Sequence, residues 1–229
     1  MARDTLTRDQ IVRTAIELLD ADSLEGLNMR ALGKRLNSAA TAVYWHIENK
    51  DNLLLLAADH VWGELDLPDL DGADWRATAT AMATDLYRMF LRHPWLVHAF
   101  AAHVLYGENK ARHDDHSLAL HETAGFTGAQ ADRAAAAVFT YVLGNAAGAA
   151  ATASLTRKLD QQGNGTAEQQ IHQAMTKAQE IAMRHPRLRA RLGTAAAGYA
   201  AAPDDSFELG LQALLDGLQR QASAERVAP

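Results

Sequence analysis

The sequence has no cysteine and few aromatic residues, and both absences narrow the classes of protein that it can encode. Without Cys, neither disulfides nor thiolate metal sites can form. Aromatic residues make up only 6% of the 229 residues although 48% are hydrophobic, so most of the apolar bulk comes from Ala and Leu. These residues favour helices, and no segment shows the apolar–polar alternation of a strand. The composition therefore predicts an all-α protein with a packed core.

The chain also lacks the excess of positive charge that is typical of proteins coating nucleic acids. Its formal net charge is −6, and residues 1–60 contain seven Lys and Arg against nine Asp and Glu, a net of −2. Any binding of DNA must therefore use a focused basic patch, and an oriented dimer would present two such patches together.

No hydrophobic run suited to a membrane is visible. Residues 134–153 carry no charge, but they are mostly Ala, Gly and Thr, with Asn145 near the centre, which is poorly hydrophobic for a bilayer span. Residues 1–6 are polar and no apolar run follows them, so we expect no signal peptide. We therefore expect a cytoplasmic protein.

Residues 28–50 have the pattern of two short helices joined by a tight turn. Apolar residues recur at i, i+3 and i+7 from Met29, which predicts one buried face on the first helix. Asn28 offers the side-chain oxygen that an N-cap needs. Asn37 follows the last apolar residue and belongs to the few residue types that tolerate a left-handed turn conformation.

The second short helix is expected to begin after Ser38 as its cap and to cover residues 39–45, with Val43 and Ile47 facing inward. Two helices joined this tightly form a helix-turn-helix, whose second helix can enter the major groove of DNA. The segment carries a local charge of +3, from Arg30, Lys34, Arg35 and Lys50 against Glu48.

Two interpretations of this segment remain open from the residues alone. Capped pairs of short helices occur in many proteins without nucleic acid partners, because a fold does not fix a function. The outward positions of the second helix, however, are small or hydrogen-bonding and suit close approach to base edges and phosphates. Lys50 could hold a phosphate together with the amides of a helix N-terminus. We therefore favour a DNA-binding function.

The run VYWHIENKDNLL at residues 43–54, preceded by MRALGKRL, resembles the DNA-binding domain of the TetR family of one-component repressors. The resemblance covers roughly the first sixty residues, and the Tyr-Trp-His run and the Asn-Lys pair stand at the family's spacing. Asn37 stands where the family often has a glycine. The resemblance implies that six residues occupy DNA-contact positions: Arg30, Ala40, Thr41, Tyr44, His46 and Lys50.

A larger helical domain is expected to follow this N-terminal three-helix helix-turn-helix domain. The first helix opens on a capping box at residues 7–10, and a further apolar helix follows Lys50. Residues 65–74 are rich in acidic residues and include Pro68 and Gly72, which indicates a linker. We therefore predict a DNA-binding domain at 1–66 and a regulatory and dimerisation domain at 73–229. Its expected helices cover residues 73–92, 95–105, 113–125, 127–159 and 166–185, and a last one that begins at 206.

Two helices of the second domain carry patterns typical of packing against a large partner. The long alanine-rich helix has Gly144 and Gly148, which permit close approach, and the last helix has a leucine stripe. Both patterns could equally fill the core of the chain itself. The last helix is similar to the terminal helix of TetR-type domains, which implies a four-helix bundle between two chains. We therefore expect a homodimer that binds a palindromic operator.

A ligand cavity between the helices of the second domain is the expected regulatory site. The TetR resemblance implies that a small effector binds there and releases DNA. It does not imply tetracycline, because the tetracycline repressor's drug- and magnesium-binding positions fall on Asp66, Met82, Leu86, Ala101 and Ser117, and none has the expected side chain. For each candidate ligand contact, packing in the core remains the alternative role. The candidates are Met82, Leu86, Phe90, His98, Phe100, His103, Tyr106, His116, Phe139 and Asn145.

Six of the ten histidines lie between His93 and His121, which leaves two other hypotheses open. His113 and His116 are one helical turn apart and could bind a metal with Asp114 or Asp115. This spacing matches no strong metal motif, so we expect no metal and no cofactor. A helical hydrolase is less favoured still, because no nucleophile elbow, phosphate loop or HExxH occurs. We therefore expect that the protein is not an enzyme. The main alternative to a DNA-binding regulator is a helical small-molecule- or metal-binding protein without sequence-specific DNA binding.

Overall fold

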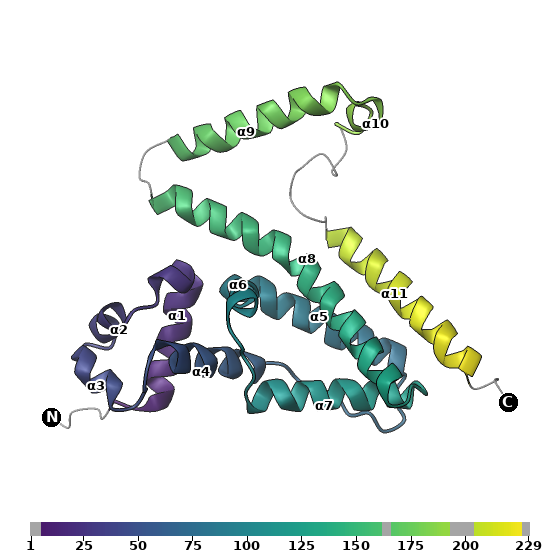
Figure 1. The fold of residues 1–229 in the computed structure, drawn as a ribbon, viewed down its shortest axis with the longest axis horizontal. Coiled ribbons are helices and arrows are strands. Elements are labelled where there is room, and N and C mark those ends of the chain that lie inside the picture. Colours follow the sequence, from purple (N-terminus) through teal and green to yellow (C-terminus); the bar gives the residue numbers. More distant parts are fainter. Residues whose placement is uncertain (1–5, 162–165, 193–203, 226–229) are drawn as a thin grey trace.

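The computed structural model describes residues 6–161, 166–192 and 204–225, and all regular secondary structure in these ranges is helical. The predicted all-α fold is therefore confirmed. Figure 1 shows α1–α4 gathered at one end and the long helix α8 running across α5, α6 and α7. The helices are α1 (Arg8–Gly26), α2 (Met29–Arg35), α3 (Ala40–Tyr44), α4 (Lys50–Trp62), α5 (Trp75–Arg92), α6 (Pro94–Ala102), α7 (Glu108–Thr123), α8 (Ala129–Gln161), α9 (Thr166–Met183), α10 (Pro186–Arg189) and α11 (Asp204–Glu225).

Helix α1 begins on the predicted capping box. The Gln10 N–H donates to Thr7 Oγ1 at 3.2 Å, and the Thr7 N–H donates to Gln10 Oε1 at 2.9 Å, so two orphan amides of the first turn are satisfied. The expected turn at 22–26 is present as a break within α1 at Ser23, whose φ of 60° is outside the helical region. This break redirects the chain into α2.

The core of α1–α4 is built from the apolar positions that the sequence pattern predicts. Leu32, Val43 and Ile47 are at most 1% exposed and pack with Ile11 and Leu53 from α1 and α4. The stretch between α4 and α5, residues 63–74, contains the predicted linker and forms no helix.

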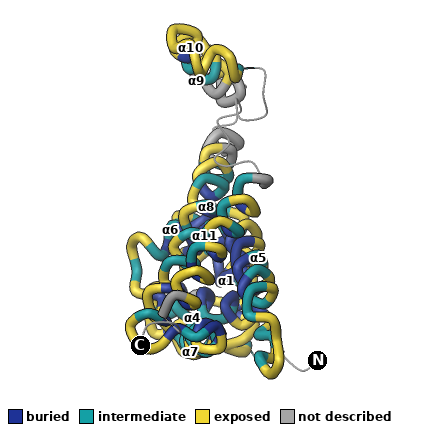
Figure 2. Tube along the Cα trace, turned by 90° about the vertical axis from the view of Figure 1, so that its right-hand side faces the viewer, coloured by how far each residue is buried: buried dark blue, intermediate teal, exposed yellow. Residues whose placement is uncertain are grey.

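Helix α8 is the centre of the second part of the chain. It packs against α5, α6, α7 and α11, whereas α9 packs with α10 and touches α8, and the two lie away from the core of the molecule (Figures 1 and 2). Burial is concentrated where α8 crosses α5, α6 and α7, and most of the described side chains of α9 and α10 are exposed. The position of the cavity described below follows from this crossing.

One helix of the described ranges, at Ala129–Leu155 in α8, is long and apolar enough to span a bilayer on those criteria alone. Only 22% of its hydrophobic window is buried within the chain. Length and apolar composition are weak evidence for a membrane span, because helices that pack in soluble proteins meet the same two criteria.

Two helix boundaries differ from the expected ones in a way that affects the site. Helix α7 begins at Glu108 and not at 113, which adds more than a turn that includes Lys110. The N-cap position is Gly107, which has no side chain and therefore gives no local capping signal. Helix α6 ends at Ala102, short of the expected 105.

Candidate DNA interface and ligand cavity

The turn of the helix-turn-helix is fixed by Asn37. Its φ of 48° lies in the left-handed region that we predicted for this residue. The Asn37 N–H donates to Lys34 O at 3.2 Å, and the Ser38 N–H donates to Gly33 O at 2.8 Å. These two bonds are those of a Schellman motif, which closes α2 and turns the chain directly into α3.

Ser38 belongs to this turn, and the prediction that it caps α3 is wrong. Helix α3 begins at Ala40, and its N-cap is Ala39, which makes no side-chain capping bond. Ala39 is extended, with φ −69° and ψ 141°, and occupies the N-cap position, so the helix starts one residue later than expected. Helix α2, in contrast, has the predicted cap, in which Asn28 Oδ1 accepts the Ala31 N–H at 2.8 Å.

The outward side chains of this region form an exposed polar face. Arg30, Thr41 and His46 are exposed, and Tyr44 is 52% exposed. Ala40 begins α3, but its side chain is outside the described set. Lys50 is also exposed and lies at the first position of α4, where its Nζ donates to Leu24 O at 3.1 Å.

The basic patch is smaller than the sequence count suggests. Arg35 forms an ion pair with Glu17 of α1 at 3.5 Å, and this pair offsets one of the four positive charges of the patch. Arg30, Lys34 and Lys50 are the cations of this segment with no acidic partner among the described residues. The face therefore keeps a small positive area next to α3.

Trp45 is a candidate DNA contact that the sequence reasoning missed. It is 87% exposed at the end of α3, between Tyr44 and His46. The signal was available, because a residue two positions from the buried Val43 must point away from the core of a helix. Its indole N–H can donate a hydrogen bond to a phosphate.

Trp45 is expected to report DNA binding through its fluorescence. Trp62 and Trp95 are only 1% exposed, and Trp75 is half-buried at the start of α5, outside the helix-turn-helix, so a bound duplex should change mainly the emission of Trp45. We expect operator DNA to alter the tryptophan emission of the wild-type protein and to leave that of Trp45→Phe nearly unchanged. A full-size signal in Trp45→Phe would show that DNA acts on one of the other three tryptophans, and would contradict this placement.

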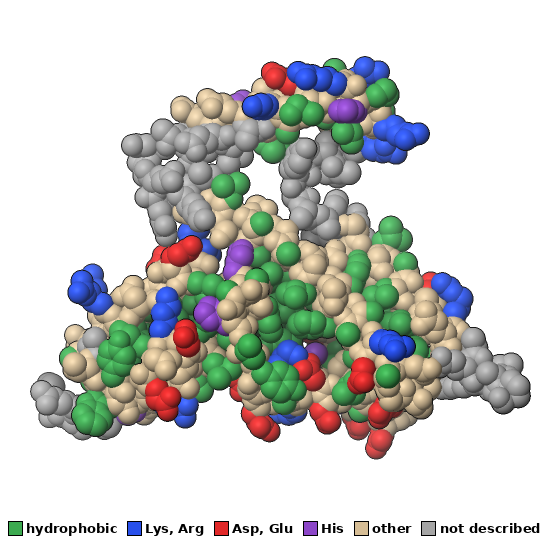
Figure 3. All heavy atoms as spheres, in the orientation of Figure 1, with side chains coloured by type: hydrophobic (Ala, Val, Ile, Leu, Met, Phe, Trp, Pro, Cys, Tyr) green, Lys and Arg blue, Asp and Glu red, His purple; other side chains and the backbone are tan. Residues whose placement is uncertain are grey.

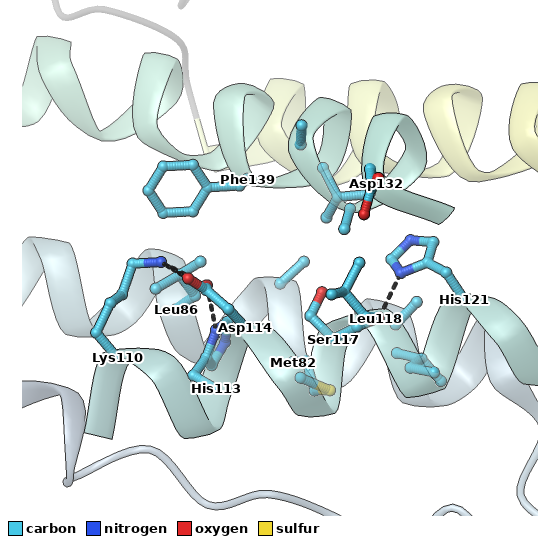
Figure 4. Close-up of a pocket in the computed structure, with 16 residues that line it drawn as sticks. Met82, Leu86, Lys110, His113, Asp114, Ser117, Leu118, His121, Asp132 and Phe139 are labelled. Carbon is cyan, nitrogen blue, oxygen red and sulfur yellow. Dashed lines mark hydrogen bonds and ion pairs between the residues drawn. The ribbon is translucent and has the colours of Figure 1, made fainter. Parts of the chain in front are cut away.

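A cavity of about 280 Å³ lies between α5, α7 and α8 (Figure 4). Its apolar walls come from Met82 and Leu86 of α5 and from Val138 and Phe139 of α8. Helix α7 contributes polar side chains at helical spacing along one face, which are Lys110, His113, Asp114, Ser117 and His121. An apolar chamber with a few polar groups is the usual form of a small-molecule site.

At one end of the cavity, Lys110 is buried and already neutralised. Its Nζ is paired with the Asp114 carboxylate and lies 4.8 Å from the Trp62 ring centroid and 5.1 Å from that of Phe139. Burial alone would raise the pKa of the Asp114 carboxyl, but the neighbouring His113 and Lys110 outweigh it and hold that pKa below its usual value. His113 Nδ1 is 3.7 Å from Asp114 Oδ1.

At the other end, His121 presents a free acceptor. Its Nδ1 is 2.7 Å from Ser117 O, which can only accept, so Nδ1 carries the proton and donates. Burial lowers the pKa of His121 despite this hydrogen bond, so the ring is neutral at pH 7. The other nitrogen, Nε2, is buried and has no hydrogen-bond partner among the described residues.

Three of the predicted ligand residues, Met82, Leu86 and Phe139, line this cavity. Phe90 and Phe100 lie beside it, in an aromatic cluster with Trp62 and Phe139. The remaining five are not among its lining residues. His98 and His103 are half-buried, and Tyr106 is 59% exposed. His116 has a buried Nε2 with no hydrogen-bond partner in the described part of the chain, and Asn145 donates to Tyr141 O within α8.

Metal binding at the histidine-rich segment finds no geometric support in the described ranges. No three His, Asp or Glu side chains come together there as ligands of one ion. The His113 ring faces Asp114 and the Trp62 ring, and the centroids of the His113 and Trp62 rings are 4.9 Å apart.

Helix α4 is joined to α7 through Asp59. Its Oδ1 accepts the backbone N–H groups of Asn109 at 2.9 Å and Lys110 at 3.1 Å, and its Oδ2 accepts from Asn109 Nδ2 at 3.2 Å. Asp59 therefore caps the N-terminus of α7 from another helix. Its approach needs Gly107, where a Cβ atom would lie 2.4 Å from Asp59 Cγ.

His93 joins α1 and the end of α4 to the α5–α6 corner. Its Nδ1 is 2.8 Å from Asp20 Oδ1 and its Nε2 is 3.3 Å from Glu64 Oε2. Trp95 Nε1 donates to the same Asp20 oxygen at 2.8 Å. Burial alone would lower the pKa of His93, but hydrogen bonds and attraction from Asp20 and Glu64 outweigh it and raise that pKa.

Comparison with known proteins places this arrangement among transcriptional regulators. Residues 67–222 match the family model of the "Tetracyclin repressor-like, C-terminal domain". The chain is 30% identical to the transcriptional repressor DrrR1 of Streptomyces coeruleorubidus over 222 residues, which cover 95% of this chain and 78% of that protein. It is 41% identical to an HTH-type regulator of Saccharopolyspora erythraea over 140 residues, 61% of this chain and only 59% of that relative.

Solved structures of similar proteins extend the likeness to the whole chain. Apo ActR from Streptomyces coelicolor superimposes with a TM-score of 0.70 at 28% identity, covering 98% of this chain and 100% of that one. ActR in complex with actinorhodin superimposes with a TM-score of 0.72 at 29% identity, covering 94% and 96%.

Proposed function

Because this chain belongs to the TetR family of helix-turn-helix transcriptional regulators, we propose that it is a ligand-responsive repressor whose homodimer binds a palindromic operator and is released by a small molecule. The family membership confirms the resemblance inferred from residues 43–54. One observation carries the proposal. A helix-turn-helix closed by a Schellman motif has an exposed polar face, and Asp59 of the adjoining helix α4 joins it to α7, which forms one wall of the cavity.

The DNA-binding role falls to residues 1–66 and the regulatory role to residues 73–229. In the first part, Arg30, Thr41, Tyr44 and His46 face base edges or nearby phosphates, and Lys50 faces a phosphate. Ala40, at the start of α3, allows close approach of the helix to the groove. The exposure of the four polar side chains and of Lys50 supports this assignment.

Dimerisation uses α8 and α11. Leu209 is 73% exposed and Leu155 is 49% exposed, and a Cβ atom added at Gly144 or Gly217 would meet nothing within 4 Å, so these surfaces are open to a second helix pair. Figure 3 shows mainly hydrophobic side chains and backbone over α8 and α11, with acidic side chains gathered along the lower edge. A four-helix bundle with a second copy would cover this face and explain why so little of α8 is buried within one chain.

The effector occupies the cavity between α5, α7 and α8. Complexes of ActR with (S)-DNPA and with actinorhodin show that a protein of this type binds small molecules. A regulator of this kind acts where the chromosome is, so we place it in the cytoplasm. The relatives are regulators, and no catalytic role is proposed.

The test is an anisotropy titration with labelled DNA from upstream of the protein's own gene and its neighbours. A repressor should bind one palindromic site with two chains per duplex, in a salt-sensitive way, and should bind scrambled DNA far more weakly. Weak binding that is equal for all sequences would contradict the proposal and leave a helical binding protein without an operator.

Lys50→Ala is expected to weaken binding to all DNA sequences about equally and to reduce the slope of log affinity against log salt by about 1, because one phosphate contact is lost. Lys50 also donates to Leu24 O, so a structural effect must be separated from the loss of charge. Lys50→Gln keeps a donor but no charge, and should weaken binding as much as Lys50→Ala. If both variants kept the wild-type salt slope, Lys50 would not contact a phosphate.

A further inference from the structure

We propose that the effector is a compact apolar ring system that carries a hydrogen-bond donor, best a protonated amine, and that His121 and Asp132 recognise this donor. The inference rests on the proposed function, because it takes the cavity between α5, α7 and α8 as the effector site. Figure 4 shows the His121 imidazole of α7 and the Asp132 carboxylate of α8 at the same end of the cavity, away from Lys110.

His121 favours a ligand with a hydrogen-bond donor, because the free nitrogen of its ring can only accept. The Nδ1 proton is committed to Ser117 O, and the neutral ring leaves a lone pair on the buried Nε2. A buried acceptor without a partner is costly, and a ligand N–H or O–H directed at Nε2 removes that cost. A ligand that presents only acceptors at this end gains nothing from His121.

Asp132 and the charge balance of the walls favour a cation over an anion. Lys110 is the positive wall residue, and it is neutralised by Asp114 and covered by the Trp62 and Phe139 rings. Asp132 is exposed, lies in the first turn of α8, and has no ion-pair partner among the described residues, so the charged walls carry a net charge of −1. An ammonium group beside His121 can donate to Nε2 and pair with Asp132 at once.

The size and the apolar walls of the cavity limit the remaining part of the ligand. A volume of about 280 Å³ is small for a ligand pocket, and it suits roughly two or three fused rings rather than a larger effector. Met82, Leu86 and Phe139 offer only apolar contact in the middle of the chamber. The apolar ring system would lie there, with its donor toward His121.

Four naphthalenes of matched shape test this chemistry: 2-methylnaphthalene, 2-naphthalenemethanol, 2-naphthylmethylamine and 2-naphthoate. Binding to the full-length protein is measured by titration calorimetry at pH 7. We expect the alcohol to bind about tenfold more tightly than the methyl compound, because of the bond to His121. The ammonium compound should bind more tightly than the alcohol, because it also pairs with Asp132, and the carboxylate should bind most weakly of all.

Two variants assign the preference to its residues. His121→Phe should abolish the advantage of the alcohol over the methyl compound while the methyl compound binds as before. Asp132→Asn, at an exposed site that carries little risk to folding, should reduce only the advantage of the ammonium compound over the alcohol.

The proposal is overturned if naphthoate binds most tightly, if all four compounds bind equally, if none binds, or if the donor preference survives in His121→Phe. Operator binding without any effector is measured in parallel on the same samples. Intact operator binding with a failed ligand series would reject the ligand class alone, whereas loss of operator binding would reject the repressor function.

Discussion

Replacing Asp59 with alanine is expected to lower the free energy of unfolding by about 2 kcal/mol and to weaken the coupling between effector binding and DNA release. The carboxylate accepts three hydrogen bonds from Asn109 and Lys110 at the start of α7. Gly107, at the N-cap position, has no side chain, so no local group can replace Asp59. The first turn of α7 would therefore lose its cap.

The effect on regulation follows from what the two helices carry. Helix α4 begins at Lys50, on the side that we propose faces DNA, and α7 carries Lys110, Asp114 and His121 along the cavity. A ligand that shifts α7 must either move α4 through Asp59 or break these hydrogen bonds. Allosteric couplings are typically about 1–3 kcal/mol, so the loss of one such joint is expected to raise the effector concentration needed for release several-fold to roughly 100-fold.

Operator release is measured by anisotropy at increasing effector concentration, with thermal unfolding of the same samples as the stability control. Gly107→Ala attacks the same contact from α7, because its Cβ atom would displace the Asp59 carboxylate, and should reproduce the uncoupling. Asp59→Asn keeps one acceptor oxygen and should fall between wild type and Asp59→Ala. Unchanged release in both Asp59→Ala and Gly107→Ala would show that the signal does not pass through this contact.

The same contact shows where sequence reasoning reaches its limit. The caps of α1, α2 and α4 come from Thr7, Asn28 and Asn49, each next to the helix it caps, and the first two are visible in a short window of sequence. The cap of α7 comes from a residue about fifty positions away, so the helix appeared to begin at 113. Lys110 was thereby left off the helix face on which it lies.

The sequence singled out three of the residues that line the cavity. Met82 and Leu86 lie on the predicted apolar face of the helix at 73–92, and the structure brings them together with Phe139 of α8. His121 could not be singled out, because its role depends on a local bond to Ser117 and on the approach of α8. Trp45 was different: its exposure was implied by the buried Val43 and Ile47.

The helix-turn-helix was the most predictable part because each of its determinants is local. Asn37 adopts the left-handed conformation that its residue type permits, and the apolar positions of α2 and α3 face inward as their spacing requires. Ser38 was misassigned because both a turn and an N-cap favour serine, and it is the extended backbone of the next residue, Ala39, that places the N-cap there.

His93 is expected to make the stability of the protein fall as the pH rises through neutrality. Both ring nitrogens face carboxylate oxygens, Nδ1 toward Asp20 and Nε2 toward Glu64, so the doubly protonated imidazolium suits the site. Glu64 also pairs with Arg92 at 3.2 Å, and Arg157 donates to the backbone oxygen of Asp20 at 3.4 Å. These neighbours complete the charged surroundings of the ring from α1, α4, α5 and α8.

The sign of the dependence follows from the raised pKa of His93. Below about pH 6.5, the ordinary pKa of histidine, the imidazole is protonated in both the folded and the unfolded chain, and the full stabilisation is present. As the pH rises through the higher pKa of the folded state, the native protein loses a proton that it had held more tightly than the unfolded chain. The stabilisation from His93 is then lost.

Thermal unfolding of the wild type and of His93→Gln between pH 5 and 9 measures this contribution. We expect the variant to be less stable by about 2 kcal/mol or more at pH 6, because Asp20 and Glu64 lose their partner, and the difference to shrink toward pH 9. Asp20→Asn should reduce the pH dependence without removing the ring. A wild-type and variant difference that stays constant across this range would mean that His93 does not titrate between the two carboxylates. Because His93 ties α1 and the end of α4 to the corner that follows α5, its deprotonation should also loosen the joint between the helices that we propose read DNA and those that wall the cavity.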